Sequence, residues 1–223
     1  MNMWRKWLRI ISIPKTLFVN FRFFPFSIAL KLPFFVRYNA TIRIKGRIVF
    51  TGPVKKGMIH FGFNEHPCCN RYDKTMLCVD KGGVLSVNGR LYMGNGCKIC
   101  VHSGGTLAIG DFVRSTGSTA IECFKNITIG NNVLFSWDCL VMDSDSHKIF
   151  SPEGDLINPD NPISIGDDVW IGSRSVILKG SKIPKNVVVA SSSVTSGGGI
   201  LRENSVIAGI PAKPVKSIGS WKL

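Results

Sequence analysis

Aliphatic residues recur every six positions in the last third of the chain. Seven of eight successive slots are aliphatic in this stretch: Ile165, Ile171, Ile177, Ile183, Val189, Thr195, Leu201 and Ile207. A second stripe of small and aliphatic residues follows four positions later: Val169, Ser175, Val187, Ser193, Gly199 and Ser205. A helix repeats near 3.6 residues and a strand near 2, so a sustained period of six fits neither. The pattern predicts an all-β fold, a parallel β-helix in which three short strands form each triangular coil and every sixth residue points inward.

The same period is fainter earlier in the chain, where it stops around His60–His66 and resumes at Val79, and it is interrupted again further on. It begins near Ile42, shifts its phase at Ile129, and stops over residues 148–164, which are rich in Pro, Asp and Asn. It returns in phase at Ile165. A segment that leaves a solenoid and re-enters it in phase is an insertion on one face, and such insertions often carry function. We therefore expect one protruding loop over 148–164.

The first forty residues follow a different pattern. Four apolar residues fall at helical spacing, with basic residues on the other faces: Trp4, Trp7, Leu8 and Ile11. This amphipathic, partly helical arm could lie in a membrane interface, or its aromatic residues could cap the end of the solenoid. No apolar run is long enough to span a bilayer, and repeated charges and prolines argue against a signal peptide. The expected regions are an arm over 1–40, a β-helical domain over 41–215 and a tail over 216–223.

The high positive charge of the chain limits the kinds of molecule that it is expected to bind. The 223 residues carry a formal net charge of +14, and the first quarter holds much of it. An anionic membrane surface or a polyanionic small molecule would suit this charge. No nucleic-acid-binding motif accompanies the basic residues, so we expect no nucleic acid partner.

Cysteine usage indicates the compartment. Seven cysteines without a secretory signal are typical of reduced thiols in a cytoplasmic protein. Cys97 and Cys100 have metal-ligand spacing, but a zinc site would need a second such pair, and Cys68-Cys69 is not one. We expect small apolar fillers along the coils and no metal.

One histidine stands where the period expects an aliphatic residue. His147 ends the run Met142-Asp143-Ser144-Asp145-Ser146-His147, so two carboxylates precede it at i−4 and i−2. In an extended strand these three side chains would share a face. A neutral imidazole oriented by a carboxylate is the usual general base near pH 7. A core histidine or an Asp-rich turn is the alternative, but the position beside the expected loop favours a catalytic site.

Several motifs resemble a known family. They are Ile129-Gly130-Asn131-Asn132-Val133, Trp137-Asp138, the run that ends in His147, Ile165-Gly166-Asp167-Asp168-Val169-Trp170-Ile171-Gly172, and Val206-Ile207-Ala208-Gly209-Ile210-Pro211-Ala212-Lys213. The chain resembles the left-handed β-helix hexapeptide-repeat acyltransferases, in particular the sugar and polysaccharide O-acetyltransferases of capsule and lipopolysaccharide biosynthesis. The resemblance covers about the last hundred residues. It implies a left-handed coil, acetyl-CoA as the donor, a saccharide acceptor, and a homotrimer with active sites shared between subunits.

The resemblance also implies roles for individual residues. His147 corresponds to the catalytic base, and Asp145 or Asp143 to its acidic partner. Positions that would line the coenzyme are Trp170, Gly172, Ser173, Ser191, Ser192, Thr195 and Lys213. The family often has a Thr-Lys pair in the penultimate coils, which the run Val194–Gly199 lacks, so phosphate contact would fall to Lys213, Lys216 or Arg202.

The expected function is transfer of an acetyl group from acetyl-CoA to a saccharide hydroxyl, in the cytoplasm or at the inner face of the membrane. An N-acyltransferase acting on an amino sugar or small acceptor is one alternative, and a non-catalytic solenoid is another. A carbonic anhydrase of the same fold would need three clustered histidines, and the four of this chain are scattered: His60, His66, His102 and His147.

Overall fold

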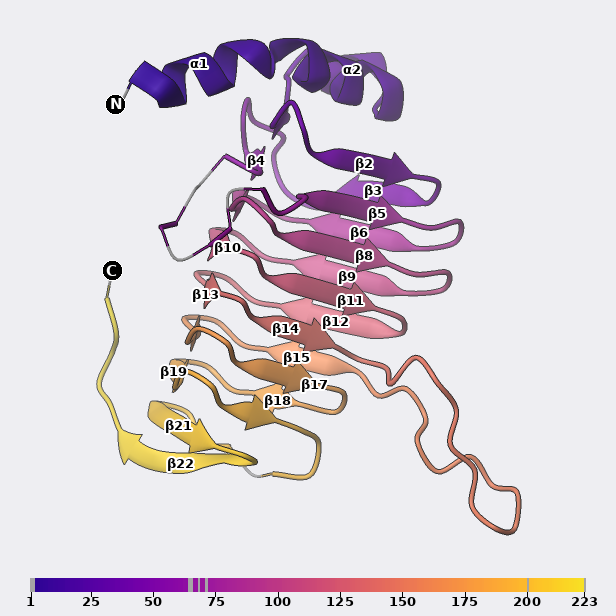
Figure 1. Cartoon of the computed structure of the whole chain (residues 1–223), viewed down its shortest axis with the longest axis vertical. Coiled ribbons are helices and arrows are strands. Elements are labelled where there is room, and N and C mark those ends of the chain that lie inside the picture. Colours follow the sequence, from indigo (N-terminus) through magenta and orange to yellow (C-terminus); the bar gives the residue numbers. More distant parts are fainter. Residues whose placement is uncertain (1–2, 64–65, 68, 71, 200, 223) are drawn as a thin grey trace.

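A stack of triangular coils forms the body of the protein (Figure 1). The computed structural model describes residues 3–63, 66–67, 69–70, 72–199 and 201–222. The chain passes through three parallel sheets in turn, here called sheets A, B and C, and each passage completes one coil. The three edges of the prism are named by the sheets they join: the A–B, B–C and C–A corners.

The sheets run the length of the stack. Sheet A contains, in spatial order, β1 (Phe34–Val36), β4 (Ile59–Phe61), β7 (Leu91–Met93), β10 (Val113–Gly117), β13 (Leu134–Trp137), β16 (Trp170–Ile171), β19 (Val187–Val189), β21 (Ser205–Gly209) and β22 (Ala212–Ser217). Sheet B contains β2 (Thr41–Ile44), β5 (Met76–Val79), β8 (Lys98–Val101), β11 (Ala120–Cys123), β14 (Leu140–Met142), β17 (Val176–Leu178) and β20 (Val194–Thr195). Sheet C contains β3 (Arg47–Phe50), β6 (Val84–Val87), β9 (Thr106–Ile109), β12 (Asn126–Ile129), β15 (Ile163–Ile165) and β18 (Lys182–Ile183). Among the strands of the described residues, β21 and β22 alone pair antiparallel.

The six-residue period places its slots inside the prism, as predicted. Seven of the eight are buried at 2% exposure or less: Ile165, Ile171, Ile177, Ile183, Val189, Thr195 and Ile207. The second stripe is buried too, except for the exposed Gly199, and its serines bond the backbone; Ser175 Oγ donates to the carbonyl of Ala190 at 3.0 Å. Stacked inward residues therefore make one continuous apolar core.

Coil length explains why the pattern is faint in the first half. In sheet B, Leu77 pairs with Ile99 and Ile99 with Ile121, which are steps of 22 residues. Further along, Ile177 pairs with Thr195, a step of 18. The longer coils carry extra residues at their corners, so the phase drifts although the stacking is regular.

One corner is built from residues that tolerate a left-handed backbone. Four residues of the C–A corner have φ between +53° and +55°: Asn132, Asp168, Asn186 and Asn204. Asn and Asp adopt this conformation more readily than other non-glycine residues. Their side chains also bond from coil to coil, Asn132 Nδ2 to Asp168 Oδ1 and Asn186 Nδ2 to Asn204 Oδ1, both at 2.8 Å. The repeated Asn/Asp thus fixes both the turn and the stacking.

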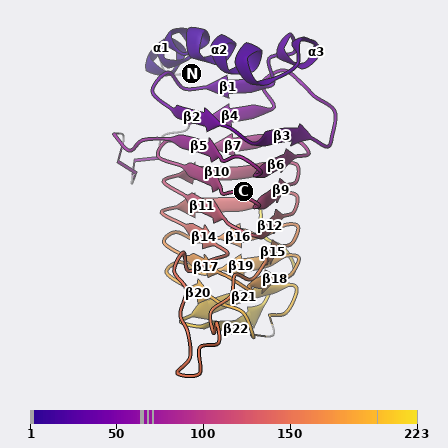
Figure 2. The ribbon, with the colours of Figure 1, turned by 90° about the vertical axis from the view of Figure 1, so that its right-hand side faces the viewer.

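Helices close the first end of the stack. α1 (Met3–Ile11), α2 (Ile13–Phe23) and α3 (Phe26–Ala29) lie across β1 (Figures 1 and 2). The predicted helical arm is confirmed, and its aromatic Phe24 stacks on Phe34 with ring centroids 5.6 Å apart. The predicted face with Trp7, Leu8 and Ile11 is divided: Leu8 is buried, whereas Trp7 and Ile11 are exposed. The side chain of Trp4 lies outside the described residues. No described helix has the length and hydropathy needed to cross a bilayer.

The protruding loop is present and longer than predicted. The chain leaves the stack after β14 and returns at Ile163, two residues before the predicted return at Ile165. The excursion extends from the B–C corner (Figures 1 and 2). Phe150 and Leu156 pair as an antiparallel bridge near its tip.

Candidate active site

Asp143 anchors the start of the loop. Its buried carboxylate accepts hydrogen bonds from the backbone N–H groups of Phe124 at 2.7 Å, Lys125 at 2.9 Å and Asn126 at 2.7 Å. These three residues form the B–C corner of the preceding coil. Asp143 therefore holds one corner to the next, because a carboxylate with three N–H donors is fully satisfied where it lies.

Asp145 is bound to a different group of residues. Its Oδ2 accepts from Lys179 Nζ at 2.6 Å and from Asn158 Nδ2 at 2.9 Å. The bond from Lys179, followed by that from Asn158, lowers the pKa of Asp145 below its usual value. Asn158 Nδ2 also donates to the carbonyl of His147 at 2.8 Å. This network fixes the base of the loop with His147 on it.

His147 itself is exposed. Its backbone N–H donates to the carbonyl of Asp145 at 2.7 Å, while no described residue hydrogen-bonds its imidazole. The prediction that Asp143, Asp145 and His147 share a strand face is wrong. The strand ends at Met142, and Ser146 has φ of +63°, so the chain turns before it reaches His147. For the same reason His147 lies outside the coil and not in an inward slot.

A groove of about 760 Å³ runs between the loop and the B–C corner. Its lining is mostly polar or glycine: Asp145, Ile157, Asn158, Pro159, Asn161, Leu178, Lys179, Gly180, Lys182, Ser196, Gly197, Gly198 and Gly199. Asn158, which lines the groove, bonds the main-chain carbonyl of His147, so the backbone of His147 lies at the rim of this groove. Amide, ammonium and carboxylate groups of this kind can bond the hydroxyls of a polar ligand.

The predicted coenzyme positions gather at another corner. Ser173 and Ser191 occupy the A–B corner in successive coils, with their Oγ atoms 3.3 Å apart, and Ser192 is exposed beside them. Gly172 precedes Ser173, and a Cβ there would collide with the backbone of Ser191 and Val189. Only glycine permits this close approach of two coils.

Trp170 lies on the outer face of sheet A next to this corner. It is 38% exposed, and its Nε1 donates to Ser136 Oγ at 3.1 Å. The tail folds back so that Trp221 lies 6.1 Å from Trp170, centroid to centroid, and donates its Nε1 to the carbonyl of Asp168 at 2.6 Å. Trp170 is thus held between a serine and the tail, with part of its ring accessible.

Two predicted positions differ from the rest. Thr195 points into the prism, where its Oγ1 lies 3.0 Å from Ser181 Oγ, so it is not on the outer edge. Lys213 is exposed on β22, opposite Ala208 in the antiparallel pair. It remains available to an anionic ligand beyond the last coil.

The two groups do not meet within one chain. Ser173 marks the A–B corner and Lys179 the B–C corner, with one strand of sheet B between them. The three residues of β17 (Val176–Leu178) between these turns span roughly 10 Å. His147 and the predicted coenzyme edge therefore lie on opposite sides of sheet B.

Cys139 is the nearest cysteine in sequence to His147, and its burial removes it as a nucleophile. It is 2% exposed and its Sγ donates to the carbonyl of Gly172 at 3.3 Å. Burial raises the pKa of this thiol to about 12, so the reactive thiolate is absent near pH 7.

The other histidines have partners of their own. His60 lies between Phe35 and Tyr92, and its pKa is lowered by burial and by Arg9. His66 stacks on Trp137 with centroids 4.4 Å apart. His102 Nε2 lies 2.8 Å from Glu122 Oε2, and its ring stacks on Phe124. Among the described residues, no group of His, Cys, Asp and Glu has an arrangement that would hold a metal ion.

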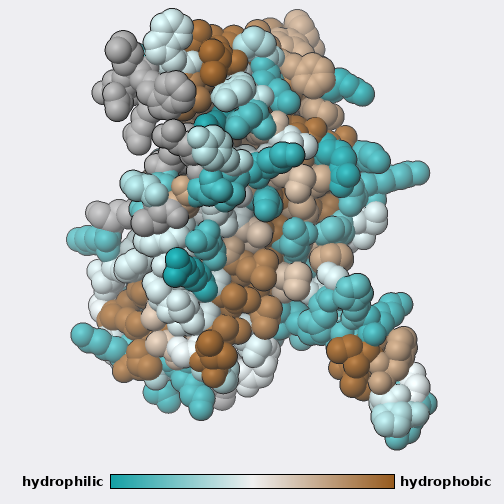
Figure 3. All heavy atoms as spheres, in the orientation of Figure 1, coloured by the Kyte–Doolittle hydropathy of each residue, from teal (hydrophilic) through white to brown (hydrophobic). Residues whose placement is uncertain are grey.

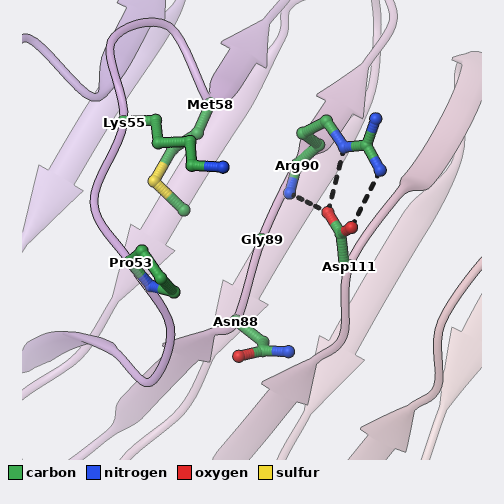
Figure 4. A pocket seen from close by; sticks show the side chains of 7 residues that line it. All are labelled: Pro53, Lys55, Met58, Asn88, Gly89, Arg90 and Asp111. Atoms are coloured by element: carbon green, nitrogen blue, oxygen red, sulfur yellow. Dashed lines mark hydrogen bonds and ion pairs between the residues drawn. The ribbon is translucent and has the colours of Figure 1, made fainter.

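A second hollow lies at the C–A corner, far along the stack from the loop (Figure 4). It measures about 420 Å³ and is lined by Pro53, Lys55, Met58, Asn88, Gly89, Arg90 and Asp111. The Arg90 guanidinium already bonds Asp111 through Nη2 at 2.8 Å and Nε at 3.1 Å. This hollow is smaller than the groove beside the loop, about 420 Å³ against about 760 Å³, and none of the predicted site residues lines it.

Sequence reasoning missed four residues of the site. Lys179 and Asn158 hold the loop, and Ser136 and Trp221 hold Trp170. Trp221 could have been noticed as an aromatic residue in a polar tail. The other three gave no signal, because their contacts depend on how distant segments pack.

Comparisons with known proteins agree with the fold. No protein-family model matches the chain. The chain is 28% identical over 144 residues to the putative lipopolysaccharide biosynthesis O-acetyl transferase WbbJ of Escherichia coli K12, covering 60% of the chain and 72% of that protein. It is 31% identical over 135 residues to a probable acetyltransferase of Mycobacterium tuberculosis, covering 60% of the chain but only 44% of that protein. The crystal structure of the polysialic acid O-acetyltransferase OatWY superposes with a TM-score of 0.54 at 27% identity, covering 83% of this chain and 88% of the other.

Proposed function

Since the chain is a hexapeptide-repeat acyltransferase with the left-handed β-helix fold, we propose that it transfers an acetyl group from acetyl-CoA to a hydroxyl of a saccharide. The observation that carries the proposal is an exposed histidine, His147, on a loop that leaves the coil, with its main chain bonded to Asn158 in the lining of a polar groove. Two similar proteins are named as O-acetyltransferases, one of lipopolysaccharide biosynthesis and one of polysialic acid. Both names support a saccharide acceptor.

His147 acts as the general base. Its neutral imidazole removes the proton of the acceptor hydroxyl as that oxygen attacks the thioester carbonyl carbon. The C–O bond forms, and the C–S bond breaks as the tetrahedral intermediate collapses. The imidazolium returns the proton to the departing thiolate, so the enzyme ends unchanged and carries no covalent intermediate.

The groove beside His147 receives the acceptor. Asn158, Asn161 and Lys179 present amide and ammonium donors, and Asp145 and Asn158 present acceptor oxygens. A sugar hydroxyl both donates and accepts, so this mixture is suited to it. The Asp145–Lys179 pair orients the loop and does not take the proton, because neither group contacts the imidazole.

The coenzyme lies along the A–B corner. Trp170 packs against the pantetheine arm, and the backbone at Gly172 and Ser173 approaches the thioester, where its N–H groups can stabilise the oxyanion. Ser191 and Ser192 extend the same edge. Lys213, with Lys216, meets the phosphates, because a cation is favoured there.

A complete site needs two chains. His147 lies at the B–C corner and the coenzyme edge at the A–B corner of the same chain, on opposite sides of sheet B. In a homotrimer with a heterologous, closed interface, the B–C corner of one subunit meets the A–B corner of the next. Three equivalent sites result, each with the base from one chain and the donor-binding edge from its neighbour.

We place this enzyme in the cytoplasm, as its cysteine usage predicts.

Transfer assays on His147 variants test the mechanism. Acetyl transfer from acetyl-CoA to a panel of saccharides is measured for the wild type, His147→Ala and His147→Gln. Loss of a general base lowers the rate by roughly 100-fold or more, so both variants lose transfer. Lys148→Ala, at the neighbouring exposed position, keeps the wild-type rate. Transfer by His147→Ala at the wild-type rate would remove the histidine from the mechanism.

Calorimetry of acetyl-CoA binding tests the donor edge separately. Trp170→Ala weakens binding, and His147→Ala leaves it unchanged, because the two residues serve different substrates. The wild type binding no acetyl-CoA would contradict the choice of donor. Transfer only to amino sugars, and to no hydroxyl, would replace O-acetylation by N-acylation.

A further inference from the structure

Helix α2 turns its polar side toward the protein and its apolar side away from it. Ser12, immediately before the helix, Thr16 and Asn20 recur every four residues and are all buried. Residues four apart share one face of a helix. That face is directed at the end of the β-helix, where β1 is the edge strand of sheet A.

The open edge of β1 accounts for this orientation. An edge strand presents N–H and C=O groups without strand partners, and burying them unpaired is costly. Asn20 Nδ2 donates to the carbonyl of Phe34 at 2.7 Å, and the N–H of Phe34 donates to Asn20 Oδ1 at 3.2 Å. The N–H groups of Val36 and Tyr38 donate to Thr16 Oγ1 at 3.1 Å and to Ser12 Oγ at 3.0 Å.

The match is one of spacing. Four helical residues rise about 6 Å and two strand residues rise roughly 6.6 Å, so each turn of α2 meets every second residue of β1. The polar side of the helix is thereby committed to the solenoid and cannot face solvent.

The outer side of the helical cap, residues 6–31, is consequently apolar. Nine large apolar side chains of this region are at least 41% exposed: Trp7, Ile10, Ile11, Ile13, Leu17, Phe18, Phe21, Phe26 and Leu30. Figure 3 shows apolar residues gathered over the helices at the top of the molecule. A concentrated apolar surface of this kind marks a docking site.

Charge indicates what the surface docks on. Five basic residues stand among the apolar ones: Lys6, Arg9, Lys15, Arg22 and Lys31. The first 64 residues contain twelve Lys and Arg and no Asp or Glu; the first acidic residue is Glu65. Apolar side chains with an unopposed basic set fit the interface of an anionic bilayer, where the rings enter the acyl boundary and the cations meet phosphates.

We propose that this helical cap, residues 6–31, docks the protein on an anionic phospholipid bilayer. The proposal goes beyond the acyl transfer above and does not depend on it. The cap closes one end of the stack, so the solenoid would stand away from the bilayer (Figures 1 and 3). Sheet B places β14 four strands beyond β2, roughly 19 Å at the usual strand spacing. The groove beside the loop therefore stays open to an acceptor in water while the cap is bound.

Co-sedimentation with vesicles tests the proposal. The full-length wild type is mixed with vesicles of phosphatidylcholine alone and of phosphatidylcholine with phosphatidylglycerol. It binds the anionic vesicles, and added salt weakens the binding. Phe18→Glu lowers the bound fraction at least tenfold, because it places a charge in the apolar face.

Matched control variants separate docking through the cap from nonspecific effects of the substitutions. Phe150→Glu, on the protruding loop, changes a side chain of nearly equal exposure, 57% against 59% for Phe18, and leaves vesicle binding as in the wild type. Lys15→Glu weakens binding, whereas Lys185→Glu on the C-terminal coils does not. Phe18→Glu retains transfer to a soluble saccharide, so a failure of docking is distinguished from a failure of the acyltransferase proposal.

Three results would overturn the proposal. The first is equal binding of Phe18→Glu and the wild type. The second is equal binding to neutral and anionic vesicles. The third is that the wild type binds no vesicle and the cap instead pairs with the cap of a second copy. Analytical ultracentrifugation would then give Phe18→Glu half the molecular mass of the wild type.

Discussion

Asp143 and His147 are four residues apart, yet they perform different tasks. Asp143 is enclosed by three N–H groups of the preceding corner, and His147 stands in solvent at the base of the loop. The prediction that both side chains share one face assumed an extended strand from Asp143 to His147. The chain turns at Ser146 instead, so the two side chains do not share a face. The members of this motif therefore do not share one role, although they are close in the sequence.

Asp111 provides a test of electrostatics at the scale of one residue (Figure 4). The hydrogen bond from the Arg90 side chain lowers the pKa of Asp111 to about 2. A depressed carboxyl pKa stabilises the fold above the unfolded pKa near 4, and this contribution is lost as pH falls toward 2. Both side chains are more than a third exposed, so the contribution is at most about 1 kcal/mol after solvent screening.

Arg90→Gln removes the cause of that shift. The carboxyl titration of Asp111, followed by NMR, moves up toward its ordinary value. The free energy of unfolding drops by up to about 1 kcal/mol at neutral pH, and the difference from the wild type shrinks as pH falls below about 4. Lys185→Gln, an exposed cation elsewhere, produces neither effect. An unchanged Asp111 titration in Arg90→Gln would mean that another group sets its pKa.

At the scale of elements, α2 and β1 show how a solenoid ends. Every inner strand has a neighbour on both sides, whereas β1 relies on side chains of the helix. Asn20 serves both the N–H and the C=O of Phe34, so it imitates a missing strand.

The variant Asn20→Ala measures how much these two hydrogen bonds contribute to the free energy of unfolding. It leaves two buried backbone groups of Phe34 without a partner, at about 1–3 kcal/mol each, so the free energy of unfolding falls by about 2 kcal/mol or more. Asn39→Ala, at an exposed position, changes it by less than about 0.5 kcal/mol. Denaturant titrations of the two variants and the wild type measure these changes. Equal unfolding midpoints for Asn20→Ala and Asn39→Ala would show that the hydrogen bonds of Asn20 do not stabilise the fold at this edge.

The coil could be predicted from sequence because stacking imposes one rule on every turn. Ile165, Ile171 and Ile177 must each point inward, so their spacing records the geometry directly. The orientation of α2 could not be predicted in the same way. Its polar and apolar sides are visible in the sequence, but which side faces inward depends on the hydrogen bonds that β1 lacks.

The candidate site was predictable in part for a related reason. Trp170, Gly172, Ser173 and Ser191 lie where the coil repeats, and they gather at one edge. The loop obeys no repeat. Its base is fixed by Lys179, which is 34 residues from Asp145, and such a contact leaves no local pattern.

At the scale of the whole molecule, charge and chemistry occupy separate regions. The first 64 residues carry twelve basic and no acidic residues, while the groove and the proposed coenzyme edge lie in the later coils. One end would hold the protein at a surface, and the remaining length would carry out the reaction. This division lets docking and transfer be altered independently.

The most direct measurement is complementation between two inactive variants. His147→Ala lacks the base, and Ser191→Trp blocks the coenzyme edge with a bulky exposed side chain. Each variant alone lacks acetyl transfer. Co-expressed, they form mixed assemblies in which some interfaces join an intact His147 from one chain to an intact edge from the next, and these regain transfer. If the mixed assemblies stay as inactive as either variant alone, the base and the donor edge of one site do not come from two chains.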